Sequence, residues 1–172
     1  VTQSSGAHEM GEVDFEDLHR EESYGKWKAY GQSKLANLLF AYELQRRLED
    51  AGVEDIISVA CHPGYADTNL QYRGPEMSGS RVRYGLMKVA NTVFAQSAAK
   101  GALPMLYAAA AETVEGGGYY GPGGLLGMRG LPEKQESSDA SYDEGTAERL
   151  WAVSEELTGV GYDFEALAPR PA

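Results

Sequence analysis

Apolar side chains recur at intervals of three and four residues along the segment from Tyr30 to Asp50. This spacing predicts an amphipathic α-helix. Gly52 predicts the end of the helix, after two arginines that complement the negative end of its dipole. This helix constrains the fold most, because it stands between two short β-branched segments. The recurring apolar residues are Leu35, Leu38, Leu39, Tyr42 and Leu48, and the arginines are Arg46 and Arg47.

The flanking segments predict two strands of a parallel sheet. Residues 1–3 have the composition of a strand end and run into Ser4-Ser5-Gly6. Residues 56–61 form an apolar run without alternation, which is typical of a strand that is buried on both faces. A strand, a helix and a strand in this order form a right-handed crossover unit. We therefore expect an α/β fold of Rossmann type, in which a parallel sheet has helices on its faces.

The remaining chain supports this fold class without adding a repeat. We expect residues 11–28 to be a surface connection whose charges form a solvated face, and residues 69–82 to be irregular. Pro104 predicts a kink or a late start in its helix. The other expected elements are helices over 84–94, 97–111 and 143–157, a short strand over 116–120, a loop over 121–130 and a frayed tail over 168–172.

Composition narrows the class of protein and of partner. The 172 residues include 26 Asp and Glu against 15 Lys and Arg, for a net charge of -11. This balance argues against nucleic acid and anionic membranes as partners. It is typical of a salt-adapted, halophilic cytoplasm, although ordinary acidic proteins also show it. The sequence has no membrane-length apolar run and no signal-peptide pattern, which favours a cytoplasmic location. One cysteine and three scattered histidines make a metal site of these ligands unexpected.

Tyr30 and Lys34 are the first candidates for chemistry. Residues four apart lie on the same face of a helix. A phenol titrates near pH 10, and a neighbouring ammonium stabilises the phenolate and lowers the pKa. Ser4-Ser5 and His62-Pro63-Gly64 follow the two strands, at the edge where open α/β sheets bind ligands. A hydroxyl, a phenol and an ammonium at one crevice suit carbonyl reduction.

Other interpretations of the same residues are weaker. The glycine cluster over 121–130 lacks the pattern of a phosphate-binding loop, so we expect an ordinary loop. Ser5, His62 and Asp67 could form a hydrolase triad, but no G-x-S-x-G elbow surrounds the serine. Ser5 could instead cap a turn, as serine often does. We expect His62 to be structural and Cys61 to be a small buried residue.

Together these motifs resemble the short-chain dehydrogenase/reductase family, in particular its retinol dehydrogenase and WW-domain oxidoreductase subgroup. The matching segments are Val1 to His8, Ala29 to Asn37, and His62 to Gly64. The resemblance implies that Ser5, with Ser4 as the alternative, Tyr30 and Lys34 are catalytic. It also implies that a cofactor, NADP or NAD with NADP slightly preferred, contacts Tyr30, Lys34, Pro63, Gly64 and Thr68.

The family's glycine-rich Thr-Gly-x-x-x-Gly-x-Gly turn has no counterpart in this sequence. We therefore expect residues 1–172 to be the carboxyl-terminal part of one such domain, with a doubtful activity of its own. The substrate would be a small carbonyl or alcohol compound, apolar or aromatic to judge from residues 69–95, and a homo-oligomer is possible. Two alternatives remain open: a nucleotide-sugar epimerase or dehydratase of the extended branch, and a catalytically inactive remnant.

Overall fold

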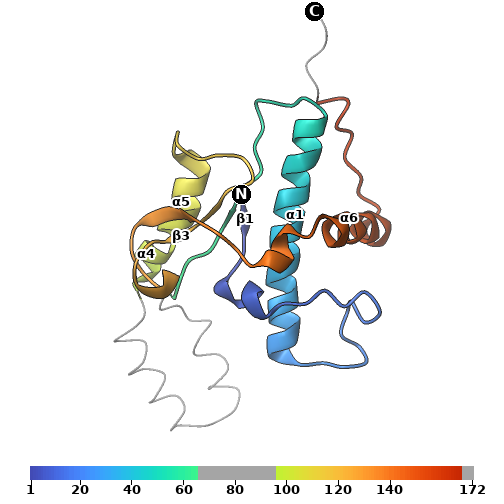
Figure 1. Ribbon diagram of the computed structural model, residues 1–172, viewed down its shortest axis with the longest axis horizontal. Coiled ribbons are helices and arrows are strands. Elements are labelled where there is room, and N and C mark those ends of the chain that lie inside the picture. The colour runs from blue at the N-terminus through green and yellow to red at the C-terminus, as the bar shows by residue number, and fades with distance from the viewer. Residues whose placement is uncertain (66–95, 168–172) are drawn as a thin grey trace, which may run out of the picture.

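The computed structural model describes residues 1–65 and 96–167, which form an open α/β fold around a mixed four-stranded sheet (Figure 1). The strand order is β1-β2-β3-β4. The first three strands are parallel and the fourth is antiparallel to the third. The strands are β1 (Thr2–Gln3), β2 (Ala60–Cys61), β3 (Tyr119–Pro122) and β4 (Pro132–Gln135). The predicted fold class is confirmed, and β4 is an addition that the sequence did not reveal.

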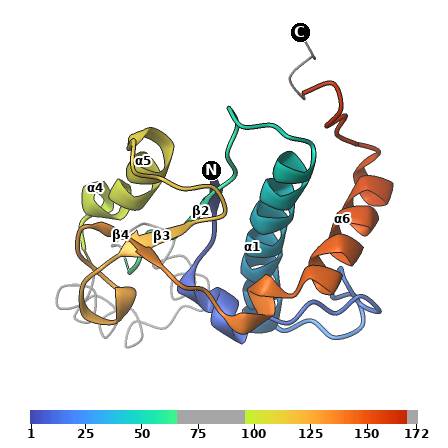
Figure 2. The same ribbon diagram turned by 45° about the horizontal axis from the view of Figure 1, so that its top comes forward.

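Helices cover both faces of the sheet. The long helix α1 contacts β1 and β2, and α5 contacts β2, β3 and β4. Figure 2 shows α6 on the side of α1 that faces away from the sheet. The helices are α1 (Lys26–Asp50), α4 (Ala98–Gly101), α5 (Leu103–Ala110) and α6 (Glu144–Thr158), and the shorter 3-10 helices are η1 (Gly6–Met10), η2 (Leu125–Gly127) and η3 (Asp139–Tyr142).

The predicted apolar stripe of α1 forms the centre of the core. Leu38 and Tyr42 pack with Ala60 and Tyr119 of the sheet. Leu35 and Leu39 pack against α6. The helix begins at Lys26, four residues before the predicted start, and Gly52 ends it with a left-handed φ of 70°. Burial on two sides explains why this helix organises the fold.

Strand β2 is shorter than predicted. Only Ala60 and Cys61 pair on both sides, whereas Ile56 and Ile57 are 42% and 46% exposed. The prediction that the whole run is a strand buried on both faces was therefore wrong at its beginning. The physical reason lies in the backbone N–H of Ser58, which donates to a side-chain oxygen of α1, Gln45 Oε1, at 2.8 Å. The residues before Ser58 therefore belong to the connection that leaves α1, and the chain joins the sheet only after it.

The second half of the chain follows the expected pattern of helix and turn. Ala102 separates α4 from α5, and Pro104 lies in the first turn of α5, as the predicted kink requires. Asp143 caps α6 through its bond from the Thr146 N–H, at 2.6 Å. Strand β3 begins and ends later than predicted: residues 116–118 lie outside it, and Gly121 and Pro122, which were expected to be loop, belong to it. The rest of the glycine cluster forms the loop between β3 and β4, which the Gly123 N–H closes on the Leu131 carbonyl at 2.8 Å. The predictions for 69–82, 84–94 and 168–172 lie outside the described residues.

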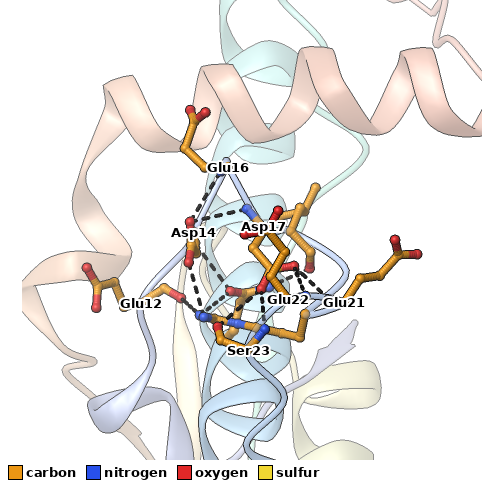
Figure 3. Close-up of polar contacts among 10 residues, drawn as sticks. Glu12, Asp14, Glu16, Asp17, Glu21, Glu22 and Ser23 are labelled. Atoms are coloured by element: carbon orange, nitrogen blue, oxygen red, sulfur yellow. Dashed lines mark hydrogen bonds and ion pairs between the residues drawn. The ribbon is translucent and has the colours of Figure 1, made fainter.

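Polar side-chain contacts hold the connection between β1 and α1 together and fasten it to α1, so its charged residues do not all face solvent (Figure 3). Arg20 pairs with Asp14 at 3.2 Å and donates to Gln32 of α1 at 2.7 Å. The Asp17 carboxylate accepts bonds from three backbone N–H groups and one hydroxyl. The predicted solvated face is correct for exposed carboxylates such as Glu16. It is wrong for Arg20, whose side chain is only 9% exposed because it fastens the connection to α1.

Candidate active site

Tyr30 and Lys34 lie one turn apart in the amino-terminal half of α1. The Lys34 Nζ is 5.6 Å from the centroid of the Tyr30 ring, so the ammonium lies over the ring face. Both side chains are partly exposed. The edge of Trp27 packs near the same ring, with centroids 6.4 Å apart. A cation over an aromatic face is attracted to it, and a positive charge beside a phenol favours the phenolate.

The end of β1 is bonded directly to the turn of α1 that carries these two residues. The Ser4 hydroxyl, in a residue 2% exposed, donates to the Lys34 carbonyl at 2.8 Å. Three residues further along α1, Asn37 Nδ2 donates to the Gln3 carbonyl at 2.9 Å. Ser4 is therefore the residue that joins strand and helix. The serine pair was the sequence signal for this site, but it did not reveal which serine has which contact.

Ser5, the preferred catalytic serine, caps η1. Its hydroxyl oxygen accepts a bond from the Ala7 N–H at 3.3 Å, so Ser5 does cap a turn, as the alternative interpretation predicted. A hydroxyl that accepts one bond can still donate its proton. Among residues 1–65 and 96–167 that proton has no acceptor. Ser5 can therefore cap its turn and donate to a bound molecule.

A close approach of two backbones holds η1 against α1. A side-chain Cβ at Gly11 would lie 2.4 Å from the Gly31 carbonyl oxygen, so only glycine fits there. Gly31 is the residue after Tyr30. The turn that begins at Ser5 is thus packed beside the turn that carries the candidate phenol.

A cleft of about 440 Å³ opens at the carboxyl ends of β1 and β2. Its wall includes Ser5, His8, His62, Gly64 and also Tyr119, whose ring contacts both histidine rings. Tyr30 and Lys34 do not line it. The structure thus brings Ser5 and Gly64 to one cleft and keeps Tyr30 and Lys34 together on α1. The Ser4–Lys34 bond connects the two groups.

The His62-Pro63-Gly64 turn forms the second wall of this cleft. Gly64 has a φ of 65°, and a Cβ there would lie 2.5 Å from the Met128 carbonyl oxygen, which explains the glycine. The Pro63 carbonyl accepts a bond from Gln96 Nε2 at 2.9 Å. The turn is therefore packed against the β3–β4 loop. Thr68, the last predicted cofactor contact, lies outside the described residues.

His62 is a structural residue, as expected. Its Nε2 is 2.8 Å from Gln135 Oε1, which can only accept, so Nε2 carries the proton. Its Nδ1 accepts from the Gly64 N–H at 3.3 Å. Burial lowers the pKa of His62, so the ring is neutral near pH 7. Both nitrogens are occupied, and neither is left to act as the base of a Ser5 hydrolase triad.

Cys61 is buried, with 1% of its surface exposed, and its thiol lies 3.9 Å from Met105 Sδ. Burial raises the pKa of this thiol to about 11. A thiol that stays protonated at neutral pH is a poor nucleophile. The expectation that Cys61 is a small buried residue is confirmed.

Comparisons with known proteins agree with this architecture. No family model matches the sequence. Retinol dehydrogenase 14 of Mus musculus is 35% identical over 93% of this chain, and polyprenol dehydrogenase of Mus musculus is 39% identical over 94%. The chain spans about 44% of the length of each of these relatives. A crystal structure of an uncharacterized protein from Mycobacterium paratuberculosis superposes with a TM-score of 0.69 at 36% identity, over 94% of this chain and 50% of that one.

The open mixed sheet, with three parallel strands and a crossover helix, is a Rossmann-like α/β architecture. The relatives are short-chain dehydrogenases/reductases, and the chain belongs to that family. Among the described residues, no helix has the length and apolar character needed to cross a bilayer.

Proposed function

We propose that this chain supplies the catalytic side of an NAD(P)-dependent oxidoreductase of the short-chain dehydrogenase type. The observation that carries the proposal is the hydrogen bond from the Ser4 hydroxyl to the Lys34 carbonyl, at 2.8 Å. It fixes the strand end bearing Ser5 relative to the helix turn bearing Tyr30. A proton donor and an oxyanion donor thereby occupy set positions, as catalysis by preorganised groups requires.

Each residue has a defined role in this proposal. The Tyr30 phenol donates a proton to the carbonyl oxygen during reduction and accepts it back during alcohol oxidation. The Lys34 ammonium over the ring stabilises the negative charge that the phenol oxygen carries once its proton has moved to the substrate. The Ser5 hydroxyl donates a hydrogen bond to the same substrate oxygen and stabilises its developing charge. The bound nicotinamide supplies or accepts the hydride.

The cleft fits the nicotinamide end of such a cofactor. Its volume of about 440 Å³ lies within the ~300–1,000 Å³ usual for small-molecule sites. The neutral His62 and the stacked Tyr119 provide flat parts of the wall, and the lining also includes Glu9 and Glu136. Ser5 and the Pro63–Gly64 turn would face the ring, and Thr68 would follow them. NADP is the slightly preferred cofactor, and the substrate is proposed to be an apolar carbonyl or alcohol in the cytoplasm.

The experiment joins this chain to the amino-terminal half of one of the matched relatives and measures NAD(P)H-dependent carbonyl reduction. Tyr30→Phe keeps the ring and removes the proton, so kcat should fall by the ~10²–10⁴-fold typical of a lost general acid. Cofactor affinity is measured alongside, because Tyr30 is also an expected cofactor contact. Tyr24→Phe is the matched control, because Tyr24 lies in the neighbouring loop and is 76% exposed. Wild-type turnover in Tyr30→Phe would overturn the assignment.

A catalytically inactive remnant is the second candidate, and the cofactor and the same chimera test it. NADPH titrated against the chain alone should bind weakly or not at all, since a glycine-rich turn and its helix hold the pyrophosphate in this fold. A chimera that binds the cofactor but reduces no carbonyl would favour the remnant. Turnover of nucleotide sugars alone would favour an epimerase or dehydratase.

A further inference from the structure

His8 is a buried histidine, 2% exposed, that follows Ser5 by one turn of η1. Its Nδ1 lies 2.7 Å from the Ser5 carbonyl oxygen, and its Nε2 lies 3.1 Å from the backbone N of Ser138. A backbone N–H can only donate, so Nε2 is the acceptor. Nδ1 therefore carries the proton and donates it to Ser5. The surrounding backbone thus fixes the tautomer of this ring.

The His8 ring is also held in orientation. The His8 and Tyr119 rings are nearly perpendicular, with centroids 5.5 Å apart and planes at 81°. Tyr119 in turn stacks on His62, with centroids 5.1 Å apart. The Ser5 carbonyl receives a second bond, from the His8 backbone N–H at 3.0 Å. Two donors from one residue therefore fix the peptide that follows Ser5, and with it the direction of the Ser5 side chain at the cleft.

His8 does not act on the Ser5 hydroxyl itself, because both of its nitrogens are already bonded to backbone groups. It can only act through the position of Ser5. His62 provides an internal comparison in the same cleft. It has the opposite tautomer, with the proton on Nε2. Its unprotonated Nδ1 accepts a bond from the Gly64 N–H, so this ring makes no bond to Ser5.

We propose that His8 is a positioning residue for the candidate catalytic serine. Its Nδ1–H aims Ser5 at the substrate oxygen, and its Nε2 anchors that arrangement to Ser138, at the start of η3. This inference rests on the proposed function, because a precisely aimed hydroxyl matters only if Ser5 donates to a substrate. Displacement of a reacting group by about 1 Å can cost on the order of 10²-fold in rate.

The test is a double-mutant cycle in the chimera described above, with Ser5→Ala and two His8 variants. His8→Asn keeps a donor close to the position of Nδ1. His8→Gln places its amide near the position of Nε2, where the amide oxygen can accept from the Ser138 N–H, and leaves no donor at the position of Nδ1. We expect Ser5→Ala to lower kcat by about 10²–10³-fold, as loss of one oxyanion donor does. His8→Gln should lower kcat by about 10–10²-fold with little change in KM, and His8→Asn should restore part of that loss.

The cycle separates positioning from folding. If His8 acts through Ser5, His8→Gln should cause no further loss of kcat in the Ser5→Ala background. An equal loss in both backgrounds would overturn the proposal, as would wild-type kcat in both His8 variants. A measurement without any variant is ¹⁵N NMR of the imidazoles in the wild-type chimera, which should show Nδ1–H for His8 and Nε2–H for His62. A Nε2–H tautomer at His8 would also overturn it.

Failure of this proposal is distinguishable from failure of the proposed function. If Tyr30→Phe and Ser5→Ala both keep wild-type turnover, the proposed function is wrong and the inference about His8 falls with it. If those two variants lose activity while both His8 variants keep wild-type kcat, only the positioning role is wrong.

Discussion

The two halves of α1 are held in place by different physical means. The carboxyl-terminal half is fixed by apolar burial: Leu38 and Leu39 are fully buried between the sheet and α6. The amino-terminal half, which carries Tyr30 and Lys34, also buries Leu35, but it is fixed in addition by directional bonds from β1 and from the connection before it. Apolar packing is non-directional and contributes most of the stability, whereas hydrogen bonds contribute less and set geometry.

The difference indicates how stability and catalytic geometry are divided along one helix. The distal half anchors the helix in the fold, and there the buried Glu43 carboxylate is also bonded by two arginines, at 2.7 and 2.6 Å. The half that carries the candidate site remains partly exposed, so that a substrate and a cofactor can reach it. Variants in the two halves should therefore separate stability from activity.

The largest expected effect is on the distal half. Leu38→Ala removes a fully buried side chain and leaves a cavity, which should lower the free energy of unfolding by about 2–5 kcal/mol. Chemical denaturation followed by circular dichroism measures this loss. Leu106→Ala is the control, because Leu106 is 60% exposed on α5 and should change stability little. Equal losses in the two variants would contradict the assignment of the core.

Ser4→Ala should give a smaller loss of stability but a clear loss of activity. The variant removes one bond to the Lys34 carbonyl, which is worth about 0.5–1.5 kcal/mol. In the chimera it should also lower kcat, because the Tyr30 turn is no longer fixed to β1. Ser33→Ala is the matched control on the same turn, since within the described part of the chain the exposed Ser33 hydroxyl bonds only to the Tyr30 carbonyl of its own helix. If Ser4→Ala and Ser33→Ala have the same kcat, the bond between strand and helix does not set the site.

The smallest expected effect is the pH dependence that His62, in the wall of the cleft, gives to the free energy of unfolding. Burial lowers the pKa of His62 below that of an unfolded histidine, so the unfolded chain binds the proton more readily. The contribution of neutral His62 to the free energy of unfolding is complete above about pH 6.5. It is lost as the pH falls from there toward the pKa of His62 in the folded protein. One group can contribute at most about 1.4 kcal/mol per pH unit. Unfolding free energies of the wild type and His62→Gln between pH 7.5 and 5 measure it, and parallel profiles would count against this role of His62.

The sequence revealed those parts of the molecule that depend on local pattern. The helical period of Leu35 to Leu48 predicted α1, and Pro104 predicted the break between α4 and α5. Strand β4 was missed because its four residues, Pro132–Gln135, include no β-branched residue and do not alternate between apolar and polar. An edge strand can form without either feature. The exposed Ile56 and Ile57 were misjudged because hydrophobicity alone does not show where a strand begins to pair.

The candidate site divides in the same way. The spacing of Tyr30 and Lys34 made them candidates, whereas Ser5 and Gly64 were selected through the resemblance to the short-chain dehydrogenase/reductase family. The roles of Ser4 and His8 could not, because each bonds to a backbone group far away in the chain, and backbone groups leave no signature in a sequence. The sequence shows both residues, but their hydrogen-bond partners can be identified only in the folded structure.

The bond between His8 and Ser138 joins residues 130 positions apart. Ribosomes synthesise a chain from its amino terminus, so the segment that bears Ser5 emerges long before its partner exists. Contacts between such distant residues also form slowly, because closing a long loop costs entropy before any contact forms. The crossover unit of β1, α1 and β2 can assemble early from nearer contacts. We therefore expect the surroundings of Ser5 to be completed late in folding, after β3, β4 and η3 have docked, so that activity would appear after most of the secondary structure has formed.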